Sequence, residues 1–169
     1  MVKDIDLNSS EKKIPIRDFV SEEEETIYGG CYACGPRNEG GLNLEFYMLG
    51  NDKEQVEAIF TPRDNLQGWP EALHGGVVAT LLDEAAAYVA YIQNIHAVTA
   101  RLNVKFKQPV SLLAPVKVKG TLQNIKRKIM DIKTEILTLE GEQLAVASVT
   151  LMILPEHQKI KYGIVDHKE

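Results

Sequence analysis

The chain has 169 residues, of which 44% are hydrophobic and 25% are charged, and its formal net charge is −5. This length and composition fit one globular domain and exclude fibrous, collagenous and wholly disordered proteins. The longest apolar stretch, residues 77–92, is too short and too charged to span a bilayer, and the first residues lack the apolar core of a signal peptide. We therefore expect a cytoplasmic protein with no membrane partner.

The charges are unevenly distributed along the chain. Residues 1–28 carry four Lys or Arg against eight Asp or Glu, whereas residues 101–133 carry nine against one. A basic stretch inside an acidic protein suggests a local site for a polyanion. Few aromatic residues lie among these charges, so we do not expect a nucleic-acid partner.

The first 28 residues are rich in Lys, Glu, Asp and Ser and predict a charged, partly helical N-terminal arm. Residues 29–41 contain five glycines and a proline, which predict a loop with turns. Cys31 and Cys34 in this loop have the spacing of metal ligands. Zinc needs four ligands and no second pair follows, so we interpret them as ordinary loop cysteines and predict no metal; a site shared across a dimer is the alternative.

The regular elements are expected to begin at residue 42. Apolar alternation over residues 42–48 and a β-rich run over 55–60 predict a hairpin, and residues 61–73 read as irregular. Residues 77–93 have the composition of a helix, and because nearly every face is apolar, the helix should be central and buried. Four β-like runs follow, over residues 97–107, 116–126, 129–139 and 143–154.

This order of elements predicts an α+β fold in which an antiparallel sheet of about six strands surrounds one long central helix. The chain divides into an N-terminal arm (residues 1–28), one domain (29–154) and a polar C-terminal tail (155–169). A sheet with only one covered face often dimerises. We therefore expect a homo-oligomer, either a dimer or a dimer of dimers.

The predicted helix carries the features that suggest chemistry. The pair Gly75 and Gly76 opens it, so free backbone N–H groups could stabilise an oxyanion. Asp83 lies two turns further on in a stripe of small residues, where a carboxylate is costly unless it is paired or useful. Gly75 and Asp83 are about 12 Å apart along the helix, although an oxyanion donor and a base must contact the same reacting group. Two antiparallel copies could supply both groups, which predicts two composite sites per dimer.

The sequence His74-Gly75-Gly76, with Asp83 nine positions after the histidine and Thr99 sixteen after the aspartate, resembles the hotdog-fold acyl-CoA thioesterases. It is most similar to the phenylacetate-pathway and thioesterase-superfamily-member type. Residues 106–110 (Phe-Lys-Gln-Pro-Val) and the glycine loop at residues 31–44 add to the resemblance, which covers about residues 31–154.

The resemblance implies a hotdog fold and hydrolysis of an acyl- or aroyl-CoA thioester to free acid and CoA, without a cofactor. It implies that the Gly75 N–H polarises the thioester carbonyl and that Asp83 is the nucleophile or general base. Thr99 would hold the water or the carboxylate, and Gln67 is the candidate for positioning the attacking water. A thioester has a good leaving group, so a carboxylate and an oxyanion hole suffice without a Ser or Cys nucleophile.

Several residues are expected to bind the substrate: His74, Gly76, Asn65, Arg101 and Lys105. His74 would mainly set the geometry of its loop, and the loop at residues 65–73 would shape the acyl pocket. Arg101 and Lys105 belong to the basic stretch, which could bind the nucleotide phosphates of CoA but fits a solvated strand face equally well. Thr99 shares their parity along the strand, so it too could simply face solvent.

The main alternative to an enzyme is a hotdog module that binds acyl-CoA as a sensor or carrier. Such a binder gains nothing from a carboxylate close to an electrophilic carbonyl. A hydratase or dehydratase is less consistent with the sequence, because those families pair a His with an acidic residue in other motifs. Hydrolysis of a carrier-protein thioester stays open, as does the identity of the acyl group.

Overall fold

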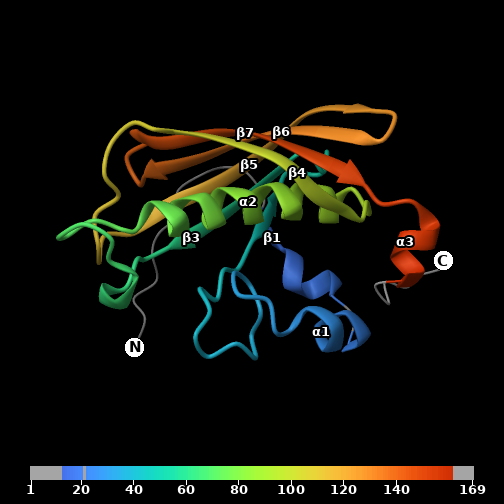
Figure 1. Cartoon of the computed structure of the whole chain (residues 1–169), viewed down its shortest axis with the longest axis horizontal. Helices are drawn as coiled ribbons and strands as arrows, with labels where there is room; N and C mark the ends of the chain where they lie inside the picture. Colours follow the sequence, from blue (N-terminus) through green and yellow to red (C-terminus); the bar gives the residue numbers. More distant parts are fainter. Residues whose placement is uncertain (1–12, 21, 162–169) are drawn as a thin grey trace.

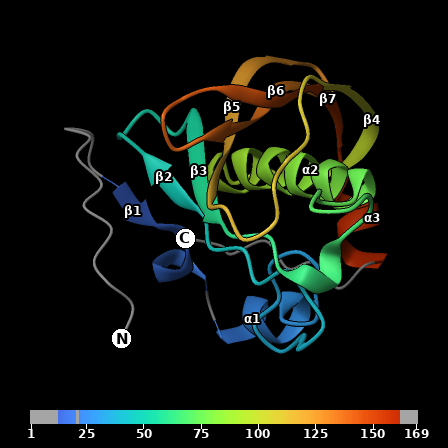
Figure 2. The same cartoon turned by 90° about the vertical axis from the view of Figure 1, so that its left-hand side faces the viewer.

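The computed structural model of the chain describes residues 13–20 and 22–161. Within them, seven strands form one antiparallel sheet in the order β1-β2-β3-β5-β6-β7-β4, and helix α2 (Gly75–Ile92) lies against one face of it (Figure 1). Figure 2 shows the sheet curving over α2, with helix α1 (Glu22–Tyr28) on the opposite side of α2. The predicted α+β plan of a sheet wrapped around one long helix is confirmed.

The later strands agree closely with the prediction. The sheet consists of β1 (Lys13–Pro15), β2 (Tyr47–Leu49), β3 (Gln55–Phe60), β4 (Ala97–Phe106), β5 (Val116–Lys126), β6 (Ile129–Thr138) and β7 (Gln143–Ile153). The first half of the predicted hairpin is shorter than expected, because residues 42–46 form no strand although Leu42, Leu44 and Phe46 are buried. Their alternation reflects the burial of every second residue in an irregular segment, in which Asn43 has a φ of 53° and the glycine loop accepts backbone hydrogen bonds of 2.8 and 2.9 Å.

Part of the predicted N-terminal arm packs into the fold and adds a strand to the six expected. β1 pairs with β2, and Ile16, in the short 3-10 helix Ile16–Phe19 that follows β1, is completely buried. Lys13 Nζ lies 2.6 Å from Oε1 of Glu57 on β3. A three-residue strand is too short to show a period in the sequence. The predicted tail contains helix α3 (Glu156–Lys161), while residues 1–12 and 162–169 lie outside the described residues.

The inner face of the sheet packs directly on α2. Leu81, Leu82, Ala85 and Val89 of α2 are completely buried. β5 approaches the helix so closely at Gly120 that an added Cβ would lie 2.7 Å from the carbonyl oxygen of Ala85, so only glycine fits there. By length and composition α2 could also cross a membrane, with a mean hydropathy of 1.3 over 18 residues. Its packing against the sheet accounts for the same apolar composition.

Within the described part of the chain, strand β4 forms an edge of the sheet and pairs with β7 alone. The register between them shifts by one residue, because Thr99 lies opposite Leu151 whereas Arg101 lies opposite Thr150. Such a β-bulge moves the flanking side chains onto opposite faces. Thr99 therefore lies on the inner face with buried Leu151, while Arg101 and Lys105 lie on the outer face.

Candidate active site

The N-terminus of α2 is capped by the histidine of the His-Gly-Gly sequence. Nδ1 of His74 accepts a hydrogen bond from the Gly76 N–H at 2.9 Å. The backbone carbonyl oxygen of His74 accepts hydrogen bonds from the N–H groups of Val77 and Val78. The Gly76 N–H is thus occupied within the chain. Among the hydrogen bonds of the described residues, none uses the Gly75 N–H, so Gly75 is the donor that the first turn leaves free.

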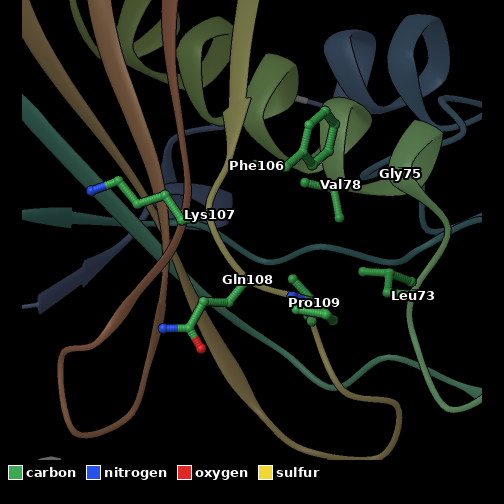
Figure 3. Close-up of a pocket in the computed structure, with 8 residues that line it drawn as sticks. Leu73, Gly75, Val78, Phe106, Lys107, Gln108 and Pro109 are labelled. Carbon is green, nitrogen blue, oxygen red and sulfur yellow. The ribbon is translucent and has the colours of Figure 1, made fainter.

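A pocket of about 310 Å³ lies beside this free donor. It is lined by the end of β4, the segment that follows it and the start of α2: Leu73, Gly75, Val78, Phe106, Lys107, Gln108, Pro109 and Val110 (Figure 3). An added Cβ at Gly75 would lie 3.7 Å from the Phe106 ring, so the ring covers the glycine without crowding it. The pocket therefore lies next to a helix N-terminus with a free N–H, a group that stabilises a negatively charged oxygen.

Asp83 lies two turns along the same helix and contacts the edge strand. The Thr99 hydroxyl donates a hydrogen bond of 2.7 Å to Asp83 Oδ1. The bulge in β4 makes this contact possible, because without it the side chain of Thr99 would share the outer face with Arg101. Asp83 is half-buried and Thr99 is exposed, so the carboxylate is oriented by a hydroxyl and still open to a ligand.

The other predicted site residues occupy different positions. Gln67 and Asn65 lie on the exposed connection before α2, where Gln67 forms an antiparallel bridge with Leu73 next to His74. Arg101 and Lys105 lie on the outer face of the sheet, away from α2. One chain therefore brings Thr99 to Asp83 and His74 to Gly76, but it does not bring Arg101 or Lys105 to Asp83.

A second group of reactive side chains lies on another stripe of α2. The ligand atoms of Cys31, Cys34 and Glu84 all lie within 4.8 Å of one another, and Cys31 Sγ is 3.9 Å from Glu84 Oε1. No local pattern in the sequence joins Glu84 to the cysteines, which lie at least 50 residues earlier in the chain. The one feature of the sequence that marks Glu84 as unusual is that it is a second carboxylate in a mostly apolar helix.

The surroundings of this group change its acidities. Burial raises the pKa of Glu84 to about 7, and the neighbouring Cys31 and Asp83 add to the increase. The pKa of Cys31 is lowered, first by a hydrogen bond from the Cys34 thiol and further by backbone N–H groups of residues 33–35. The pKa of Cys34 is raised, since it donates that hydrogen bond and is itself buried beside Glu84.

The fold and the helix N-terminus place this chain among the hotdog-fold proteins. Residues 71–145 match the family model described as the thioesterase superfamily. The crystal structure of RHA08564, a thioesterase superfamily protein, superimposes with a TM-score of 0.69 at 24% identity, covering 74% of this chain and 60% of the other. The predicted resemblance to the hotdog-fold thioesterases is confirmed.

Two further proteins extend the comparison. The chain is 33% identical over 116 residues to the acyl-coenzyme A thioesterase THEM4 of Rattus norvegicus. The aligned region covers 68% of this chain and 50% of that protein. The chain thus spans about half the length of this curated relative. The structure of smu.793 from Streptococcus mutans, bound to acetyl CoA, has a TM-score of 0.60 at 19% identity, covering 64% of this chain and 88% of the other.

Proposed function

We propose that this chain hydrolyses acyl- or aroyl-CoA thioesters, with Asp83 and Gly75 at the reacting carbonyl. The observation that carries the proposal is the hydrogen bond of 2.7 Å from Thr99 to Asp83, which fixes a carboxylate on an otherwise small-residue stripe of α2. The activity in the name of the rat relative and the acetyl CoA in the structure of smu.793 support the same substrate class.

The proposed chemistry is hydrolysis at the thioester carbonyl carbon, to which either water or the Asp83 carboxylate adds first. Asp83 acts either as the base that takes a proton from water or as the nucleophile whose acyl adduct water then cleaves. The carbonyl oxygen gains negative charge and accepts a hydrogen bond from the Gly75 N–H. The C–S bond then breaks, and the CoA thiolate leaves and takes up a proton. The Thr99 hydroxyl keeps the Asp83 carboxylate oriented throughout.

We propose that each site is shared between two copies of the chain. The pocket at Gly75 does not include Asp83, and eight residues of helix separate them by about 12 Å. Strand β4 has a free edge ten residues long, with Val98 and Phe106 45% and 56% exposed, and a long apolar edge of this kind favours pairing. Antiparallel association along β4 would bring α2 of one copy alongside α2 of the other in opposite directions.

The deciding experiment mixes two inactive variants. Asp83→Asn keeps the oxyanion donor, and Gly75→Pro keeps the carboxylate but removes the N–H. Proline is tolerated at the first position of a helix, and His74, with φ −59° and ψ 132°, already has the backbone that a following proline requires. Thiol release is measured for each variant alone and for subunits mixed by unfolding and refolding together.

A shared site predicts recovery on mixing. In a random mixture half of the dimers are mixed, and each has one intact site of two, so about a quarter of the wild-type rate should return. If both variants lose activity alone and the mixture stays inactive while mass spectrometry shows mixed dimers, the site lies within one chain. If wild type releases no thiol from short, medium, long-chain or aromatic acyl-CoA, the enzymatic proposal is wrong.

Three expectations stay predictions from the sequence. They are the cytoplasmic location, the contacts of Arg101 and Lys105 with CoA, and the absence of membrane or nucleic-acid partners. Thiol release from a carrier-protein thioester, compared with the same acyl group on CoA, tests the remaining choice of substrate.

A further inference from the structure

Two distant parts of the chain bring three metal-ligating side chains together away from Asp83. Cys31 and Cys34 come from the glycine loop, and Glu84 comes from the third turn of α2. Their ligand atoms lie within 4.8 Å of one another. A cation at their centre would need only small side-chain movements to reach the zinc distances of about 2.3 Å to sulfur and about 2.0–2.2 Å to oxygen.

The loop that carries the cysteines is held in this shape by its own backbone. The Gly35 N–H donates to the Cys31 carbonyl oxygen at 3.0 Å, and the Arg37 N–H donates to the Gly29 carbonyl oxygen at 2.9 Å. An added Cβ at Gly35 would lie 2.4 Å from the Cys31 nitrogen, so the turn requires glycine directly after the second cysteine. Ala33, between the cysteines, is only 3% exposed, which anchors the turn in the core.

The electrostatics of the cluster also favour a cation. Among the described residues, the titratable side chains of the cluster are all acidic: the two thiols, the carboxyl of Glu84 and the hydroxyl of Tyr88, which lies next to Cys34. No ion pair among the described residues includes Glu84. A half-buried carboxyl beside two thiols and without a basic partner is unfavourable when ionised, and a divalent cation would neutralise it.

We propose that Cys31, Cys34 and Glu84 bind one Zn²⁺ ion per chain. Thiolate ligands select zinc over magnesium or calcium, and two sulfurs with one carboxylate oxygen leave one position of a tetrahedron for water. All three residues are half-buried, so solvent can reach that position. Binding would displace the protons of the two thiols into solvent.

Such an ion would link the glycine loop to α2 next to the proposed active site. Glu84 follows Asp83 directly in the helix, and the cysteines already contact α2 through Glu84 and Tyr88. A zinc ion that binds the folded state and not the unfolded state would raise the free energy of unfolding by mass action. The proposal therefore concerns a structural ion, and it holds whether or not Asp83 performs hydrolysis.

The test uses the reduced 169-residue chain after treatment with a chelator. Titration with Co²⁺ reports thiolate ligation through a sulfur-to-cobalt charge-transfer band and reports tetrahedral geometry through intense visible bands, and competition with Zn²⁺ then gives the zinc affinity. The variants are Cys31→Ser, Cys34→Ser and Glu84→Gln. Asp83→Asn is the matched control, since it removes the adjacent carboxylate from a different stripe of the same helix.

The proposal predicts one metal per chain, at least about 100-fold weaker binding in either serine variant, and about 10- to 100-fold weaker binding in Glu84→Gln. Asp83→Asn should bind as wild type does. Because a serine variant could fail to fold, the wild type is also alkylated with iodoacetamide, and Zn²⁺ should protect both cysteines.

Three results would overturn the proposal. The first is no charge-transfer band and no protection of the thiols at saturating metal. The second is a Cys31–Cys34 disulfide that persists under reducing conditions, which would make the pair a redox couple. The third is equal loss of affinity in Glu84→Gln and Asp83→Asn, which would show that general negative charge, not ligation by Glu84, attracts the metal.

Discussion

Asp83 and Glu84 are consecutive carboxylates of one helix, yet the fold gives them different surroundings. Asp83 points toward the edge strand β4, receives a hydrogen bond from the Thr99 hydroxyl and stays open to a ligand. Glu84 points toward the glycine loop, where burial raises its pKa to about 7 and two thiols are its neighbours. Neighbouring positions of a helix are about 100° apart around the axis, so two adjacent acids can serve unrelated purposes.

Exchanging the two carboxylates for amides, one at a time, should separate their roles most clearly. Asp83→Asn should lower the rate of thiol release by about 100-fold or more, because a positioned acid-base group contributes about that much. Glu84→Gln, the matched control, should stay within about threefold of wild type, since Glu84 faces away from Thr99 and the pocket. Steady-state rates on the best acyl-CoA substrate check both. Equal losses in the two variants would contradict separate roles.

The second effect concerns the helix N-terminus. Gly75→Pro should lower kcat by about 100- to 1000-fold, because it removes the proposed oxyanion donor. Gly75→Ala keeps the N–H, and its Cβ would lie at an ordinary contact distance of 3.7 Å from Phe106, so it should lose far less. Circular dichroism and melting temperatures must show that both variants fold. Similar rates for the two would rule out the Gly75 N–H as the donor.

Thr99 provides a smaller and more selective effect. Thr99→Ala removes the hydrogen bond to Asp83, and because hydrogen bonds to charged groups are worth about 1.5–3 kcal/mol, we expect kcat to fall by about 10- to 100-fold. Thr99→Ser retains the hydroxyl and should recover most of the rate, whereas a role in packing alone would leave both variants alike. The measurement is kcat and KM for the two variants side by side.

The smallest effect on activity should come from the glycine loop. Gly35→Ala places a Cβ 2.4 Å from the Cys31 nitrogen, which must distort the turn that holds both cysteines. We expect about 10-fold weaker Co²⁺ binding, with thiol release within about threefold of wild type because the loop does not line the pocket. Gly30→Ala is the control, since nothing lies within 4 Å of its added Cβ. A larger loss of activity than of metal affinity would tie the loop to catalysis.

Much of the sheet could be predicted from the sequence because its later strands and central helix have strong local patterns. The helix over residues 77–93 lies within two residues of α2, and the run at 116–126 matches β5. The segment at 42–46 shows the limit of this method. Its apolar residues alternate and are buried as in a strand, yet the backbone N–H groups of Leu42 and Leu44 donate to the glycine loop instead of a sheet neighbour.

The sequence by itself determined the α+β order of elements, the buried central helix, the glycine pair at its start and the carboxylate of Asp83 on a stripe of small residues. These follow from composition and periodicity, which act over a few residues. Only the tertiary structure decided which groups meet. The bulge in β4 turned Thr99 toward Asp83, against its parity in the strand, and the loop path brought Cys31 and Cys34 to Glu84. Such side-chain contacts depend on strand register and long-range packing, which produce no periodic pattern in the local sequence.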